Sequence, residues 1–158
     1  MAKRSDTKQT AATKRVSEAL NLLRALGVPR AQQNERSALT FLALLGMTPK
    51  KQWSQAQDPM LDITEMMTYF EKHFGKKYAP NTRETVRRFT VHQFVQMGLV
   101  LPNPDDPIRP VNSPDNHYQV IPALLKLVRE YGSSSWDESL KNFVSSTEAL
   151  SRLQPRER

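Results

Sequence analysis

The sequence has no cysteine, only five glycines among 158 residues, and no apolar run near the roughly 18 residues that a membrane-spanning helix needs. The lack of cysteine excludes disulfides and thiolate metal sites and is compatible with a reducing compartment. The scattered glycines exclude a glycine-rich phosphate-binding loop. We therefore expect a cytoplasmic protein that spans no membrane.

The sequence also offers little for catalysis. His73, His92 and His117 have no neighbours at metal-ligand spacing along the chain, and no serine lies in a nucleophile elbow. Pro-Asp dipeptides occur at 104–105 and 114–115, but neither is followed by the acidic residue, spacer and lysine of a metal-dependent nuclease. We predict no catalytic residue, no metal site and no cofactor in these 158 residues.

What the sequence does contain is positive charge. Lysine and arginine number 23 against 16 acidic residues, which gives a net charge of +7. A balance of this kind favours an acidic partner, with nucleic acid first and an anionic membrane surface second.

One amphipathic helix, expected over residues 82–97, organises the rest of the chain. Pro80 precedes it, Asn81 is the expected N-cap, Glu84 completes a capping box, and Gly98 ends the helix. At about 100° per residue, its buried side is predicted to contain Val86, Phe89, Thr90, Phe94 and Met97.

The opposite side of this helix is polar and consists of Asn81, Thr85, Arg88, His92 and Gln96. Arg83 and Arg87 add charge to its first turns. This pattern is typical of a helix that is presented to a polyanion, and the side chains can address base edges. The alternative is an ordinary solvated face.

The other periodic segments predict a mainly α fold, a winged helix-turn-helix with a small two-stranded β wing. Residues 1–15 are basic and polar, and we expect a disordered arm there. Helices are expected over 16–26, over 34–45 at the centre of the core, and over 62–74, with Trp53 in the core. Strands at 99–101 and 117–121 would form the wing, and Arg109 would reach a phosphate from the loop between them. A helix over 122–131 and, after a hinge, a more polar helix from Trp136 complete the chain.

Several strings of residues resemble the N-terminal domain of the BsuBI/PstI restriction endonuclease family. They are RSALT at 36–40, ALLGMTP at 43–49, FGKKYAPNTRETVRR at 74–88, HQFV at 92–95, GLV at 98–100, PNPDDP at 102–107, RPVNSP at 109–114 and YQ at 118–119.

This resemblance implies a helix-turn-helix domain joined to a C-terminal PD-(D/E)XK nuclease domain that uses Mg²⁺ and cuts palindromic DNA, with CTGCAG as the family target. It also implies a homodimer formed through that second domain. We therefore expect residues 16–132 to be the DNA-binding domain, and residues 133–158 to be a helix and linker toward a nuclease domain that this chain lacks.

The predicted partner is double-stranded DNA. The candidate contacts lie on the helix over residues 82–97, in the loop before it and in the wing: Lys76, Lys77, Asn81, Thr82, Arg83, Thr85, Arg87, Arg88, His92, Gln96 and Arg109. Two alternatives stay open, a stand-alone DNA-binding regulator and a protein-interaction module whose basic helix meets an acidic protein.

Overall fold

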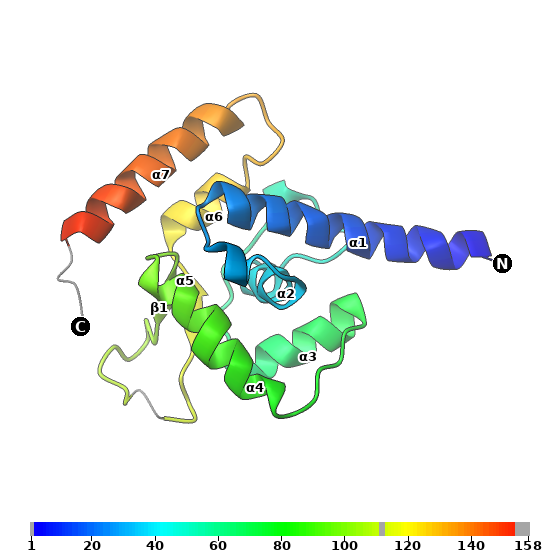
Figure 1. Cartoon of the computed structure of the whole chain (residues 1–158), viewed down its shortest axis with the longest axis horizontal. Helices are drawn as coiled ribbons and strands as arrows, with labels where there is room; N and C mark the ends of the chain where they lie inside the picture. Colours follow the sequence, from blue (N-terminus) through cyan, green and yellow to red (C-terminus); the bar gives the residue numbers. More distant parts are fainter. Residues whose placement is uncertain (1, 111–112, 154–158) are drawn as a thin grey trace.

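Helix α2 (Glu35–Leu44) lies at the centre of the fold, and all of its residues from 37 to 44 are buried. Asn34 caps it, because its side-chain oxygen accepts a hydrogen bond from the backbone N–H of Ser37 at 2.9 Å. The neighbouring helices lie around it (Figure 1). The prediction of a centrally buried second helix is confirmed.

The computed structural model describes residues 2–110 and 113–153, and the end of the predicted linker, residues 154–158, lies outside them. The described chain is mainly α-helical with one small antiparallel sheet, as predicted. In chain order its elements are α1 (Ala2–Ala25), the 3₁₀ helix η1 (Arg30–Gln32), α2, the 3₁₀ helix η2 (Trp53–Gln55), α3 (Ile63–Phe74), α4 (Thr82–Thr85), the π-helix η3 (Val86–Val91), α5 (His92–Gln96), β1 (Val100–Pro102), β2 (Tyr118–Val120), α6 (Pro122–Val128) and α7 (Trp136–Leu153).

Helix α1 corrects the expectation of a disordered arm over residues 1–15. The helix begins at Ala2, and its N-terminal part extends beyond the other elements (Figure 1). Its C-terminal half is anchored by Ala19, Leu22 and Leu23, which are fully buried. No glycine or proline interrupts residues 2–25, and Ala, Lys, Arg and Gln are good helix formers, which favours a helix that continues toward the N-terminus.

Helix α3 and the helical segment formed by α4, η3 and α5 make the predicted helix-loop-helix pair (Figure 1). A capping box starts α3: the Asp62 carboxylate accepts the Glu65 N–H at 2.7 Å, and the Glu65 carboxylate accepts the Asp62 N–H at 2.9 Å. Gly75 ends α3 in the left-handed conformation at a φ of 65°.

The second helix of the pair differs from the regular α-helix that we predicted. Its middle, residues 86–91, is a π-helix, in which each turn holds more residues than an α-helical turn. Val86, Thr90, Val91 and Phe94 are buried, whereas Phe89 is 54% exposed. The prediction that Phe89 holds the helix on its core is therefore wrong.

The predicted cap of this helix is also wrong. Asn81 has helical backbone angles and its side chain makes no capping hydrogen bond. The N–H groups of Thr82 and Arg83 donate instead to the carbonyl oxygens of Ala79 and Pro80, at 2.9 and 3.2 Å. The helical turn thus begins before Asn81, and the N–H groups of Thr82 and Arg83 already have backbone partners.

The wing is the antiparallel pair β1–β2, with Val100 opposite Val120 and Pro102 opposite Tyr118. Two backbone hydrogen bonds between Leu61 and Tyr118, at 3.0 and 2.8 Å, attach β2 to the residues before α3. The wing is therefore fixed to both helices of the helix-loop-helix pair, since β1 directly follows α5 in the chain.

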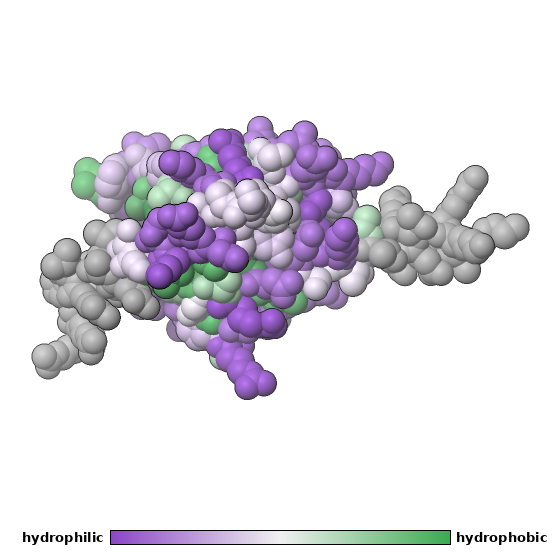
Figure 2. Space-filling model, turned by 90° about the horizontal axis from the view of Figure 1, so that it is seen from above, coloured by the Kyte–Doolittle hydropathy of each residue, from purple (hydrophilic) through white to green (hydrophobic). Residues whose placement is uncertain are grey.

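Helix α7 packs against the body of the fold. Trp136 at its start contacts the ring of Tyr131, with ring centroids 5.1 Å apart, and Leu140 and Phe143 cover the core. Trp53 also contacts Tyr131 and is buried, as predicted. The face seen from above in Figure 2 is mostly hydrophilic, with small hydrophobic areas. The domain boundary at residue 132 stays a prediction.

The π-helical phase makes a testable prediction about two phenylalanines in one helix. We expect Phe94→Ala to lower the free energy of unfolding by about 3–5 kcal/mol, because Phe94 is fully buried and contacts the ring of Phe41. Phe89→Ala should change it by about 0.5 kcal/mol or less. Urea unfolding followed by circular dichroism measures both, and equal losses would contradict the π-helical phase.

Candidate nucleic-acid interface

The outer side of the segment formed by α4, η3 and α5 is the surface on which the predicted contacts gather. Asn81, Arg88, His92 and Gln96 are exposed, and Thr85 is half-buried. Thr82 and Arg83 lie at the start of α4, where Thr82 is half-buried and Arg83 exposed. The polar side of the helix is thus accessible, although its buried side differs from the prediction.

The three arginines of this surface have different surroundings. Arg83 donates from Nε to the Thr64 hydroxyl at 3.2 Å, which connects α4 to α3. Arg87 forms an ion pair with Glu84, and this hydrogen bond lowers the pKa of Glu84, so the carboxylate is ionised at neutral pH. The Arg88 guanidinium lies 6.0 Å from the centre of the Phe89 ring. Among residues 11–110 and 113–147, whose side chains the structure describes, no ion pair forms with Arg88.

Both lysines of the loop before α4 are exposed. Lys76 forms an ion pair with Glu35 of α2 at 3.2 Å and lies 5.6 Å from the centre of the Tyr78 ring. Lys77 lies beside a shallow hollow between α3 and α4 that Pro80 and Arg83 also line. Their amines can reach a phosphate next to the start of α4, because long lysine side chains reorient at little cost on an exposed surface.

A groove of about 570 Å³ separates the helix from the wing. Its helix side and its wing side are both polar in part, and the residues that line it are Arg87, Arg88, Phe89, His92, Val95, Pro102, Asn103, Pro107, Arg109, Asn116 and Tyr118. Two arginines and a histidine on one wall make this groove suited to an anionic chain.

Arg109 lies differently from the prediction. We expected it to extend from the wing loop, but its guanidinium donates to Asn103 Oδ1 and to the Asp115 carbonyl, both at 2.8 Å, and to Asp105 at 3.0 Å. This contact lowers the pKa of Asp105. The guanidinium is thus held inside the loop, because acidic residues three and four positions earlier turn back toward it.

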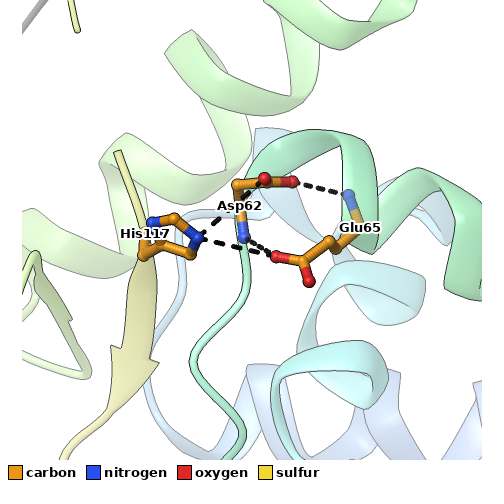
Figure 3. A group of neighbouring side chains, drawn as sticks. All are labelled: Asp62, Glu65 and His117. Carbon is orange, nitrogen blue, oxygen red and sulfur yellow. Dashed lines mark hydrogen bonds and ion pairs between the residues drawn. The ribbon is translucent and has the colours of Figure 1, made fainter. Parts of the chain in front are cut away.

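A second cluster lies where the wing meets α3, and it contains His117, Asp62 and Glu65 (Figure 3). His117 Nδ1 must donate to the Asp115 carbonyl oxygen, 2.6 Å away, because a carbonyl only accepts. Nε2 therefore faces Glu65 Oε1 at 3.7 Å and Asp62 Oδ2 at 4.0 Å.

These three side chains have the donor types of a metal site, and one ligand atom from each lies within 4.8 Å of the others. The prediction of no metal site stays a prediction. Sequence spacing missed the cluster because more than fifty residues separate His117 from Asp62 and Glu65. The two carboxylates already cap α3, which accounts for where they lie.

The sequence that forms the helix pair and the wing matches a known family. Residues 13–152 match the family described as the BsuBI/PstI restriction endonuclease HTH domain. The chain belongs to this family. The resemblance found in the sequence is thus confirmed. Separately, no helix among the described residues is long and apolar enough to cross a membrane.

Individual members of the BsuBI/PstI family are similar over most of the chain. It is 48% identical to the type II restriction enzyme BsuBI of Bacillus subtilis over 143 residues, which are 90% of this chain and 45% of that protein. It is 38% identical to the type II restriction enzyme AplI of Arthrospira platensis over 133 residues, covering 84% of this chain and 41% of that one.

The solved structure of the SdaI restriction endonuclease superposes with a TM-score of 0.79 at 30% identity. The superposition covers 87% of this chain and 44% of SdaI. The chain thus spans less than half the length of each relative that it matches.

The internal bonds of Arg109 predict how the wing loop responds to mutation and to acid. Arg109→Gln should speed amide exchange of residues 103–110 and 113–117 and leave the free energy of unfolding nearly unchanged. Arg109 lowers the pKa of Asp105 in the folded protein. The ion pair therefore stabilises the loop fully at pH values above the ordinary aspartate pKa of about 3.9, and this stabilisation is lost as the pH falls through the lowered pKa.

Amide protection factors measured by NMR test this at neutral pH and at about pH 2. The wild-type protein and the variant should differ most at neutral pH, where Asp105 is ionised. The difference should shrink once acid protonates Asp105, while the bonds of Arg109 to Asn103 and to the Asp115 carbonyl remain. Equal protection in the two proteins at neutral pH would contradict the proposed role of Arg109 in the loop.

Proposed function

We propose that this chain is the DNA-recognition domain of a type II restriction endonuclease and that it binds duplex DNA. The observation that supports this most is the exposed basic surface of the α4–η3–α5 segment beside a wing, in a chain of the BsuBI/PstI family. The major groove of DNA admits a helix, and a wing beside the helix can contact the DNA backbone.

In this proposal the contacts divide by chemistry. Lys76 and Lys77 bind phosphates before the helix, and Thr82 and Asn81 approach the backbone at its start, where the helix dipole favours anions. Arg88, His92 and Gln96 lie farther along the exposed side and address base edges or phosphates. Arg87 joins them once it leaves Glu84, and Arg83 stays attached to Thr64.

The proposal for the whole protein rests on the family. We infer that this domain acts in the bacterial cytoplasm with a Mg²⁺-dependent PD-(D/E)XK nuclease domain on a palindromic site, with CTGCAG as the first sequence to test. A palindrome pairs naturally with a two-fold homodimer, because each copy then reads one half-site. In that arrangement the residues of this chain bind and orient DNA and carry out no bond cleavage.

The first prediction from this function concerns salt dependence. Fluorescence anisotropy of the chain with a labelled CTGCAG duplex should show affinity that falls steeply with salt, because each neutralised phosphate adds about −0.9 to the slope of log K against log salt. Arg88→Gln should weaken binding and reduce that slope by about 1. A shuffled duplex measured in parallel reports whether this domain also selects sequence.

The matched control is Lys141→Gln, which removes the same charge from exposed α7, on the other side of the molecule from α4 (Figure 1). It should leave the slope unchanged. Absence of binding at low salt would refute the proposal and favour a protein-interaction module. An equal loss in both variants would show that net charge, rather than this surface, attracts DNA.

A second prediction concerns the ion pair between Glu84 and Arg87. Glu84→Gln should raise DNA affinity by about fivefold, because the carboxylate no longer competes with DNA for Arg87 and no longer repels the phosphates. Glu138→Gln on α7 is the control with the same charge change. If both variants bind equally well, the effect is one of net charge, and the proposed contact of Arg87 fails.

A further inference from the structure

Phe89 has an unusual position for a large apolar side chain. It is 54% exposed in the middle of the basic helical segment, while its sequence neighbours Thr90 and Val91 are buried. Single exposed apolar residues are common, so exposure alone decides nothing. Here the exposed ring lies within a π-helix, and π-helical turns often occur at functional sites.

Phe89 lies among basic side chains, so a ligand that contacts it should be a polyanion that also carries an apolar group. Arg88 lies 6.0 Å from the ring centre, and Arg87 and His92 line the same groove. A phenyl ring offers no hydrogen bond to a phosphate or to the polar base edges. The apolar group that duplex DNA presents in its major groove is the 5-methyl group of thymine.

The groove between the helix and the wing places Phe89 where it can contact a thymine methyl group. Phe89 lines the space between the helix and the wing, where a DNA strand would run if the helix occupied the major groove. The thymine methyl group lies at the edge of the major groove, close to the backbone of its own strand. A ring beside that strand therefore faces the methyl group, whereas the arginines on the same wall face phosphates.

We propose that Phe89 is a specificity-determining residue that contacts the 5-methyl group of a thymine. This inference rests on the proposed function, because it needs the helix to bind duplex DNA. Each strand of CTGCAG contains one thymine. In this role the exposed ring of Phe89, in the π-helical turn, is part of the surface that reads the DNA.

The test removes only the methyl group. Anisotropy of the full chain is measured with a CTGCAG duplex and with the same duplex carrying deoxyuridine in place of each thymine of the site. The wild-type protein should bind the deoxyuridine duplex about fourfold more weakly, as expected for the loss of one buried methyl contact. Phe89→Ala should bind the two duplexes equally, and more weakly than the wild type binds thymine.

Arg88→Gln is the matched control on the neighbouring residue, because it should weaken binding to both duplexes and keep the fourfold ratio. Equal binding of both duplexes by the wild type would overturn the role of Phe89 and leave the proposed DNA binding intact. The same holds if Phe89→Ala keeps the ratio, since another residue would then read the methyl group. Failure to bind any duplex would overturn the proposed function itself, and this inference with it.

Discussion

The burial of α2 is the constraint on which the interface depends. Phe41 of α2 packs edge to face on Phe94, with ring centroids 6.1 Å apart. Arg36 of the same helix donates from Nε to the hydroxyl of buried Thr90 at 3.0 Å, which satisfies a polar group that would otherwise be costly inside the core. These two contacts, one apolar and one polar, fix how the basic helix is rotated on the core. The outward position of Phe89 follows from that rotation.

The net charge of +7 does not show which basic side chains are available to a ligand, because several of them form ion pairs. Lys76 is paired with Glu35, Arg87 with Glu84, and Arg109 with Asp105. Exposed pairs of this kind are weak, so a phosphate can displace the partners of Lys76 and Arg87. Arg109 differs because it also binds Asn103 and the Asp115 carbonyl. The positive charges before and on the helix are thus available to a ligand, whereas the charge of Arg109 is neutralised within the wing loop.

Local rules were enough for much of the fold and less of the site. The apolar run of α2, the glycine after α3 and the strand pair of the wing could be predicted because each depends on nearby residues. In the basic helix, the burial of Val86, Thr90 and Phe94 was predicted correctly, whereas the exposure of Phe89 was not. The rotation of this helix depends on contacts with α2, more than forty residues earlier. The position of Arg109 and the cluster around His117 depend likewise on a loop conformation and on contacts between distant segments.

The wing is held rigidly enough to act as part of the same surface as the helix. Asn103, buried and at a positive φ of 48°, accepts hydrogen bonds from the His117 N–H and from Arg109, both at 2.8 Å, and donates to Asn116 at 2.9 Å. The Leu61–Tyr118 backbone bonds then connect β2 to the start of α3. A ligand that enters the groove between helix and wing meets two walls that are already in place. Little conformational entropy is lost when both walls are contacted at once, which favours a ligand that fills the groove.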